Sequence, residues 1–247
     1  MRARIVIDTS ILIHANYYEL KKKRDLVDYR ELYDRILSSI DTLTFALSKK
    51  GFIIGHTILC LDSSSFRYKF YKDYKAGRTH NEALGSMLAV LYKRFYRDFD
   101  CIQHEGMEAD DLAYLISQKY DNSILVSEDG DWLQMVGNGT ILYQPRKKKL
   151  IVDVDPYFEA LDKLLLGCTS DNIPKAYTGK LGRITLKKHY DLVKNNENIM
   201  LSLIKSLKEK NIIVDTKQLG VNKVIAIYSI ETYKNFIKNF DELWQNL

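Results

Sequence analysis

The sequence predicts an α/β fold built on a mostly parallel central sheet. Short apolar runs that are typical of buried strands alternate with longer segments whose apolar residues recur at helical spacing. Parallel strands need a long crossover between them, and that crossover is usually a helix. The strand pattern fades after about residue 153, so we expect residues 1–153 to form the α/β core and residues 154–247 a helical C-terminal region.

Four apolar runs predict the strands, and three further segments predict helices between them. The strands are expected over residues 4–7, 53–61, 101–103 and 123–127. One helix is expected over residues 29–49, where leucine and isoleucine recur at helical spacing, and a second over residues 81–98. A third helix is expected to begin near Glu108.

Composition excludes several classes of protein. The chain has 247 residues, of which 46% are hydrophobic and 28% charged, and it has only 3 prolines, which excludes a disordered or fibrous protein. No apolar run reaches the ~18 residues of a membrane span. Residues 1–8 lack the apolar stretch of a signal peptide, and the three cysteines, Cys60, Cys101 and Cys168, are too widely spaced for a disulfide framework. We therefore expect a cytoplasmic protein that is not secreted.

Basic residues gather in three places. The chain has 37 lysines and arginines against 32 acidic residues, a net charge of +5. Residues 66–78 and residues 171–190 are each strongly basic, and Arg146 to Lys149 form a third basic run. Separate basic runs that converge are typical of polyanion binding, although each run alone is also typical of a solvated surface.

Acidic residues follow the ends of the predicted strands. Asp8, Asp62 and Asp129 each come within two residues of a strand end. The carboxyl ends of strands in an open parallel sheet form the ligand crevice, so we expect these side chains to lie together. Each acid alone would be an ordinary turn former or helix cap. Five more acids are expected at the same edge: Glu108, Asp110, Asp111, Asp131 and Asp171.

Eight converging carboxylates need protonation or bound cations to relieve their repulsion. Oxygen ligands without a histidine or cysteine cluster favour Mg²⁺ or Mn²⁺ over zinc. Two such ions can activate a water and stabilise the leaving oxygen of a phosphodiester, while the basic runs hold the flanking phosphates. The chain has no glycine-rich nucleotide loop and no G-x-S-x-G motif, which disfavours nucleotide-triphosphate hydrolysis and serine-hydrolase chemistry.

Six motifs run in order through residues 1–190: RIVIDTS, CLD, YKDYKAGR, MEADDLAY, VSEDGDWLQMV and GCTSDNIP. Together they resemble the motifs of the 5′-nuclease (flap endonuclease) superfamily, most closely those of small bacteriophage 5′–3′ exonucleases and the T-even-type phage ribonuclease H. The resemblance implies a PIN-like α/β nuclease domain. It also implies a helical arch over about residues 76–100 and a helix–hairpin–helix over about residues 171–190 that grips duplex DNA.

The resemblance assigns the acids to two metal ions. Those that match the ligands of a first ion are Asp8, Asp62, Glu108, Asp110 and Asp111. Those that match the ligands of a second ion are Asp129, Asp131 and Asp171. Cys168 stands where the family usually has an aspartate, and because a thiol is a poor Mg²⁺ ligand we expect the second site to be weaker.

The resemblance also implies the contacts with nucleic acid. Lys75 and Arg78 match basic residues beside the scissile phosphate, where Lys75 would stabilise the developing phosphorane charge. With Asp110 and Asp129 they form the expected catalytic set. The other expected DNA contacts are Arg67, Lys72, Tyr74, Gly179, Lys180, Gly182 and Arg183. Amides of the hairpin would contact phosphates beside a K⁺ ion, although PKAYTGKLGRI departs from the usual glycine-rich pattern.

We therefore expect a metal-dependent 5′-nuclease that removes nucleotides or short flaps from 5′ ends of duplex DNA or RNA–DNA hybrids, clearing primers or flaps in replication. Two alternatives stay open: a PIN-type ribonuclease for single strands, and a branched-DNA-binding protein that has lost catalysis through Cys168. The balance of exonuclease and flap cutting and the preference for RNA or DNA also stay open. We expect a monomer, in the host cytoplasm if phage-encoded, whose residues 191–247 cover the core or dock a polymerase or single-strand-binding protein.

Overall fold

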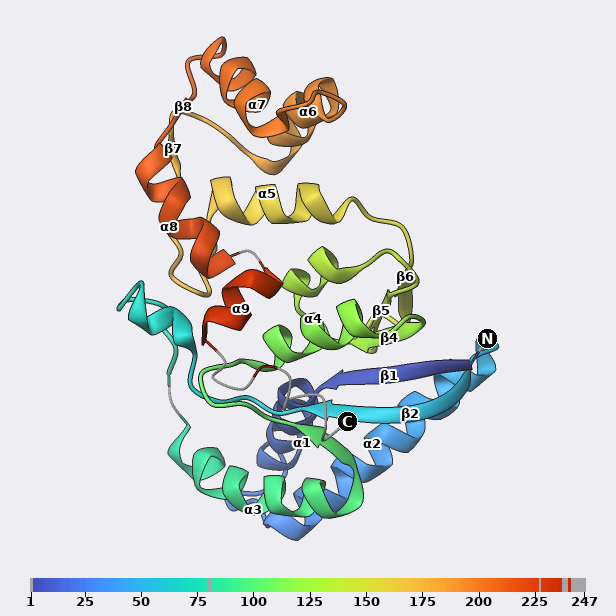
Figure 1. The fold of residues 1–247 in the computed structure, drawn as a ribbon. Coiled ribbons are helices and arrows are strands. Elements are labelled where there is room, and N and C mark those ends of the chain that lie inside the picture. The colour runs from blue at the N-terminus through green and yellow to red at the C-terminus, as the bar shows by residue number, and fades with distance from the viewer. Residues whose placement is uncertain (1, 80, 227, 237–239, 241–247) are drawn as a thin grey trace. The chain divides into compact units, whose positions relative to one another are not determined.

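The computed structural model describes residues 2–79, 81–226, 228–236 and 240. The chain forms two compact units, the first made of residues 1–65, 80–154 and 233–247 and the second of residues 66–79 and 155–232. Figure 1 shows the elements of both units along the chain. Residues 66–79 group with the second unit, although they precede residue 153; the predicted domain boundary stays a prediction.

The first unit contains a six-stranded sheet in the order β3-β2-β1-β4-β5-β6. The strands are β1 (Arg2–Asp8), β2 (Ile53–Cys60), β3 (Asp100–Ile102), β4 (Ser123–Val126), β5 (Ile141–Gln144) and β6 (Lys149–Ile151). All neighbours pair in parallel except β5 and β6, which pair antiparallel. The four predicted strands and the mostly parallel sheet are confirmed. Strands β5 and β6 were not predicted, because each is short, with four and three residues, and β6 directly follows a run of basic residues.

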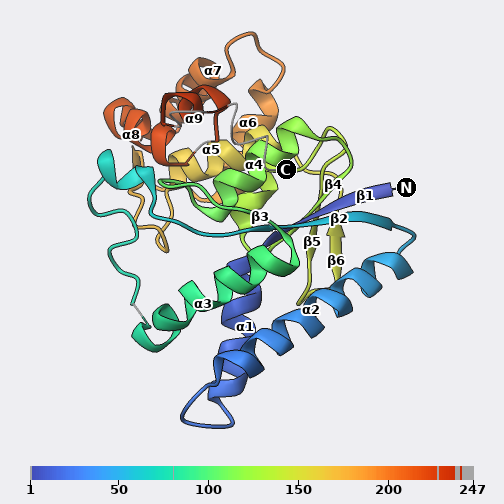
Figure 2. The ribbon, with the colours of Figure 1, turned by 60° about the horizontal axis from the view of Figure 1, so that its bottom comes forward.

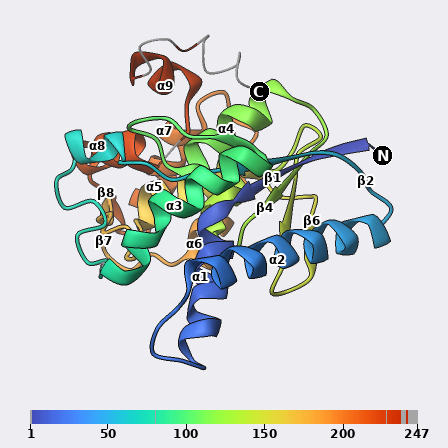
Figure 3. The same cartoon turned by 90° about the horizontal axis from the view of Figure 1, so that it is seen from below.

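Helices cover both faces of this sheet. On one face lie α1 (Thr9–Lys21), α2 (Tyr29–Lys49) and α3 (Glu82–Asp98), and on the other lies α4 (Ala109–Lys119) (Figures 1 and 3). Ile5 and Ile7 of β1 share one core with Leu12 of α1, Ile36 of α2 and Phe95 of α3. The helix of the predicted arch segment therefore buries part of its surface in this core, and the arch itself stays a prediction. A 3₁₀ helix, η2 (Gly130–Met135), follows β4.

The second unit is mostly helical. It contains η1 (Phe66–Lys69), α5 (Pro156–Leu166), α6 (Arg183–Val193), α7 (Ile199–Lys208) and α8 (Thr216–Ala226), with a small antiparallel pair, β7 (Tyr177–Thr178) and β8 (Ile213–Val214). Leu165, Leu186, Leu203 and Ile225 share its core. Only α6 begins within the predicted hairpin range 171–190, so a helix–hairpin–helix here would need α5 as its first helix.

The last described helix, α9 (Ile230–Phe236), ends in residues that belong to the first unit from Tyr233 onward. Tyr233 is 1% exposed, and its ring lies 5.9 Å from that of Tyr114 on α4. Tyr233 therefore packs against α4 of the first unit, and the role of residues 191–247 as a whole stays a prediction. Within the described ranges, no helix is long and apolar enough to cross a membrane.

Candidate metal centre

The register of the parallel strands brings the predicted acids to one sheet edge. Asp8 ends β1 and is in register with Cys60, the last residue of β2, so Asp62 follows two residues beyond the same edge. On the other side Ile7 is in register with Val126, which places Ser127 and Asp129 just beyond the end of β4. The carboxyl ends of three neighbouring strands therefore deliver these acids, as the sequence predicts.

Asp8 is held by hydroxyl groups from two elements. Its Oδ1 accepts from Ser10 N at 3.1 Å and Ser10 Oγ at 2.6 Å, which caps the N-terminus of α1. Its Oδ2 accepts from Ser127 Oγ at 3.0 Å, and the same hydroxyl accepts from Asp129 N at 3.1 Å. Asp129 Oδ1 in turn accepts from Asp131 N at 2.9 Å and caps η2. Ser127 thus links the Asp8 carboxylate to the D-G-D turn.

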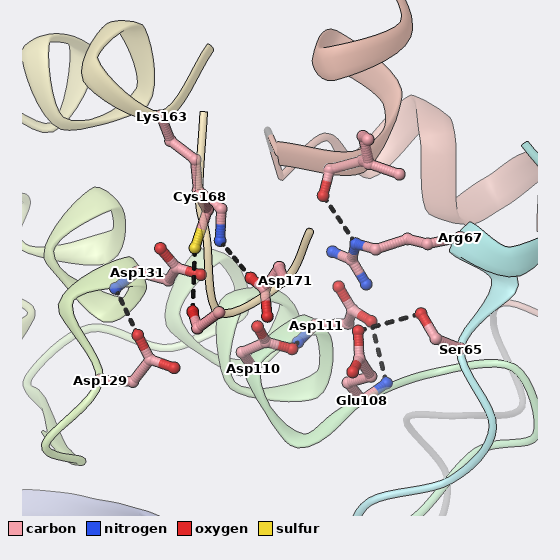
Figure 4. A network of polar contacts seen from close by, with 12 residues as sticks. Ser65, Arg67, Glu108, Asp110, Asp111, Asp129, Asp131, Lys163, Cys168 and Asp171 are labelled. Atoms are coloured by element: carbon pink, nitrogen blue, oxygen red, sulfur yellow. Dashed lines mark hydrogen bonds and ion pairs between the residues drawn. The ribbon is translucent and has the colours of Figure 1, made fainter. Parts of the chain in front are cut away.

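The N-terminus of α4 gathers a second set of acids. Asp62 Oδ1 accepts from Ala109 N at 2.8 Å, so the loop after β2 is tied to the first turn of this helix. Glu108 and Asp111 form a reciprocal capping box, in which Glu108 N donates to Asp111 Oδ2 at 2.9 Å. Ser65 Oγ donates to Glu108 Oε2 at 2.9 Å (Figure 4).

Asp110 and Asp111 differ in how the fold uses them. Asp111 is fully buried, and its Oδ1 accepts from Tyr233 Oη at 2.8 Å while its Oδ2 accepts from Glu108 N. Asp110 is half-buried, and its Oδ1 accepts from the Asp111 amide at 2.9 Å. One oxygen from each of Glu108, Asp110 and Asp111 lies within 4.8 Å of the others, a spacing that a metal ion can span.

Burial of the carboxylates at this sheet edge, and their repulsion of one another, raise the pKa of several groups. Burial and the charges of Asp110 and Asp129 raise the pKa of Asp8, although its hydroxyl donors oppose the shift. Burial and the charge of Asp8 raise the pKa of Asp62 to about 7. Burial and the charges of Asp8 and Asp62 also raise the pKa of the Cys60 thiol. An all-carboxylate donor set with repelling charges fits a hard divalent cation, which would lower these pKa values again.

In the second unit, Asp171 has the opposite environment. Its Oδ2 lies 2.9 Å from Lys163 Nζ, and both side chains are under 10% exposed. Its Oδ1 accepts from Arg78 Nη2 at 2.8 Å. Burial would raise the pKa of Asp171, but Lys163, Lys75 and Arg78 outweigh it and lower the pKa to about 2. The predicted metal ligand Asp171 therefore sits within a cluster of cations supplied by its own unit.

Two predicted motifs of the second unit lie against each other. Lys75 N donates to Asp171 O at 2.9 Å, and Asn172 Nδ2 donates to Asp73 O at 2.9 Å. Lys75 and Asn172 both adopt positive φ, at 55° and 56°, a region that costs energy for non-glycine residues. The surrounding hydrogen bonds hold the YKDYKAGR loop against the TSDNI loop in this conformation.

Cys168 opens the loop that carries Asp171. Its amide and carbonyl pair with Ile173, and its Sγ lies 3.0 Å from Ser170 Oγ (Figure 4). Gly167 before it has φ 71°, and a Cβ there would lie 2.4 Å from Ile173 O. Only glycine fits at this position, because any side chain would collide with backbone.

The expected DNA contacts divide into three groups. Lys72, Lys180 and Gly182 are exposed, and Gly182 caps α6 without a side-chain bond. Arg67 is 2% exposed and donates to Ile225 O at 2.8 Å, and Tyr74 is 3% exposed in the core, so both have packing contacts instead of exposed faces. Gly179 and Arg183 form the third group, since both are exposed but each already has a structural role. Gly179 has φ 102°, and the guanidinium of Arg183 pairs with Glu159 and Asp162 of α5.

Sequence reasoning missed several residues of the two clusters. Lys163 is a single basic residue in a helix that also carries Glu159 and Asp162, and Ser65 and Ser127 are single hydroxyls in loops, so none forms a motif. Tyr92 of α3 is a further case, because burial and the charge of Asp62 raise the pKa of its phenol. Tyr233 lies 122 positions after Asp111, and no local pattern relates them.

Comparison with known proteins identifies the family of the chain. The profile of the family described as 5′-3′ exonuclease, N-terminal resolvase-like domain, matches residues 3–161. A 5′-3′ exonuclease of Buchnera aphidicola subsp. Schizaphis graminum is 26% identical over 253 residues, covering 93% of this chain and 85% of the relative.

Two solved structures share the fold across nearly the whole chain. The T5 D15 protein co-crystallised with metal ions has a TM-score of 0.70 at 18% identity, covering 98% of this chain and 99% of that one. The bacteriophage T5 flap endonuclease, as a pseudo-enzyme-product complex with DNA and metal ions, has a TM-score of 0.65 at 17% identity, with the same coverage of 98% and 99%. Because the family profile spans more than half of the chain, the protein belongs to the 5′-3′ exonuclease family and is a 5′-nuclease.

Proposed function

We propose that this nuclease hydrolyses phosphodiester bonds at the 5′ ends or flaps of duplex DNA or RNA–DNA hybrids with bound Mg²⁺ or Mn²⁺. The observation that carries the proposal is the sheet edge of the first unit, where burial and like charge raise the pKa of Asp8 and Asp62. The bacteriophage T5 structure with DNA and metal ions supports the substrate and cofactor class.

The acids divide between two ions in this proposal. A first ion would be held by Asp8, Asp62, Glu108 and Asp110, with Asp111 as a further ligand or, through its bonds to Glu108 N and Tyr233 Oη, as the residue that positions them. A second ion would be held by Asp129, Asp131 and Asp171. The pairing of Asp171 with Lys163 and Arg78, together with Cys168, supports the expectation that this second site is the weaker one.

Bound divalent ions would supply an activated water and stabilise the leaving oxygen. The chain's own residues orient the reaction. Asp110 and Asp129 present carboxylates from an ordered helix start and an ordered turn, so their oxygens are held in place before substrate arrives. Lys75 and Arg78 supply positive charge for the phosphate, and the ion pair with Asp171 holds the Arg78 guanidinium in a fixed orientation.

Duplex contacts are assigned to the exposed basic residues and backbone amides of the second unit. Lys72 and Lys180 would neutralise phosphates, and the amides at Gly179 and Gly182 would donate to them beside a K⁺ ion. Arg67 and Tyr74 would act indirectly, by supporting the loop that carries Lys75. A role in primer or flap removal, a monomeric state, a cytoplasmic location and docking with a polymerase or single-strand-binding protein complete the proposal.

The test uses a duplex with a 5′ flap, labelled at its 5′ end, with Mg²⁺, Mn²⁺ or EDTA. The same labelled strand without its complement serves as the control. We expect metal-dependent release of short 5′ products from the duplex. Cleavage of the unpaired strand alone would favour a single-strand ribonuclease, and tight binding without cleavage in either metal would favour a binding protein.

A further inference from the structure

The first unit has a groove that the reaction does not use. It has a volume of about 1110 Å³ and is lined by residues of α1, α2 and the turn that joins β5 to β6. Figure 2 shows these three elements. On α1 its lining begins at Leu12, one turn beyond Asp8, and continues to the end of the helix. This volume exceeds the roughly 300–1,000 Å³ of small-molecule sites, so the groove has room for a longer ligand.

The floor of this groove is mostly apolar, although Asn16 and Ser39, which hydrogen-bond to each other at 3.0 Å, also line the groove. Leu12, Leu43 and Tyr143 are buried residues of its lining, and Ala15 and Ala46 keep the floor open because their side chains are small. Two large apolar side chains at the groove remain exposed: Phe45 is 64% exposed and Tyr18 is 48% exposed. Large apolar side chains left exposed beside an apolar groove are typical of an interaction site.

Positive charge surrounds this floor. The lining contains Lys22 at the end of α1, Lys49 at the end of α2, and Arg146 and Lys148 on the turn. Glu19 is its one acid. Within the residues that the structure describes, these four cations form no ion pair with a carboxylate. The groove therefore complements an acidic ligand that also carries apolar groups.

We propose that this groove binds an extended acidic peptide segment of a partner protein, with apolar side chains on the floor and carboxylates at the cations. A nucleic-acid strand fits less well, because stacking needs open ring faces along the path of the bases. Here the Lys49 ammonium lies over the Phe45 ring at 5.2 Å, and His14 stacks on Tyr18 with ring centroids 6.1 Å apart. Aliphatic side chains of a peptide bury well against Leu12 and Leu43, whereas a sugar–phosphate backbone does not.

The test measures fluorescence anisotropy with a fluorescein-labelled peptide in which glutamate and aspartate alternate with phenylalanine and leucine. One control peptide replaces the apolar residues by serine, and a second replaces the acids by their amides. We expect only the acidic, apolar peptide to bind. Its affinity should fall by about tenfold or more in the double variant Lys22→Glu with Lys49→Glu, because both changes reverse a charge at the groove.

The matched control is Lys23→Glu with Lys50→Glu. These exposed lysines are the immediate neighbours of Lys22 and Lys49 but do not line the groove, so the charge change is equal and the loss of affinity should be several-fold smaller than in the groove variant. Ala46→Trp fills the floor without changing charge and should also abolish binding. Metal-dependent flap cleavage by each variant reports that the nuclease is folded.

Three outcomes would overturn the proposal. The first is equal loss of affinity in the matched control, which would mean that the peptide responds only to net charge. The second is that a labelled single-stranded oligonucleotide binds, that the groove variants weaken this binding, and that the acidic peptide does not displace the oligonucleotide. The third is a dimer, seen by sedimentation, that Ala46→Trp dissociates, since a second copy would then occupy the groove.

Discussion

The two units place aspartates in opposite electrostatic environments. In the first unit Asp62 lies among other carboxylates, and burial with the charge of Asp8 raises its pKa to about 7. In the second unit burial also acts on Asp171, but Lys163, Lys75 and Arg78 lower its pKa to about 2. Asp62 thus lies among repelling carboxylates and Asp171 among cations, so we expect a metal ion to relieve more repulsion at Asp62 than at Asp171.

The largest effect is expected from Asp110→Ala in the first unit. The loss of this carboxylate should lower cleavage of a flap duplex by at least about a hundredfold, because activation of the water depends on the bound ion. Substrate affinity measured in Ca²⁺ should stay unchanged. Asp121→Ala, an exposed acid before β4 at the opposite sheet edge, is the matched control and should cleave normally. Loss of binding in Asp110→Ala would instead make these acids structural.

In the second unit the equivalent change acts first on stability. Asp171→Ala leaves the buried Lys163 ammonium without its partner, and breaking a buried ion pair costs about 3–5 kcal/mol. Urea denaturation should show this loss. The double variant Lys163→Met with Asp171→Leu should lose much less, since no charge is then buried alone. Equal losses in the two variants would show that the ion pair does not account for the effect.

Lys75 should affect turnover more than binding. Lys75→Ala removes the ammonium while keeping a side chain with the same backbone cost at positive φ, so folding should change little. We expect the single-turnover rate to fall by about a hundredfold, with affinity in Ca²⁺ nearly unchanged. Equal losses in rate and affinity would make Lys75 a phosphate anchor.

The pKa shifts predict opposite pH dependences for the metal-free protein. The folded pKa of Asp62 is raised from 3.8 to about 7, so its contribution to stability is full below pH 3.8 and is lost as the pH rises toward 7. The folded pKa of Asp171 is lowered to about 2, so its contribution is present above pH 3.8 and is lost as the pH falls toward 2. Urea denaturation in EDTA at a series of pH values gives the free energy of unfolding as a function of pH. In Asp62→Asn this free energy should no longer fall between pH 3.8 and 7, while its fall below pH 3.8 should remain. If the free energy of unfolding of Asp62→Asn still fell between pH 3.8 and 7 as in the wild type, Asp62 would not be the group that titrates there.

The smallest effect is expected from Cys168→Asp. A carboxylate in place of the thiol should lower the Mg²⁺ concentration for half-maximal cleavage several-fold, because oxygen is the harder ligand. Cys168→Ser provides the comparison, since it keeps the size of the side chain without adding charge. An unchanged titration in Cys168→Asp would show that position 168 does not face an ion.

Patterns within a short stretch of sequence predict which acids reach the sheet edge. They do not predict which side chains hydrogen-bond to those acids. Buried strands and the acids after them are predictable because apolar runs and strand ends are local, so Asp8, Asp62 and Asp129 converge as expected. The partners of Asp111 and Asp171 are not, because Tyr233 and Lys163 approach through packing of separate elements. Arg67 shows the same limit, since a basic residue in a basic run is buried against Ile225 O.

We propose that the first unit binds the ion on which cleavage depends, while Lys163 and Arg78 neutralise Asp171 within the second unit. The most direct measurement is calorimetric titration of Mn²⁺ into the wild-type protein, Asp110→Asn and Asp171→Asn. We expect Asp110→Asn to lose the tighter binding event and Asp171→Asn to keep it. Loss of that event in Asp171→Asn, with its retention in Asp110→Asn, would show that the first unit does not hold the tighter ion.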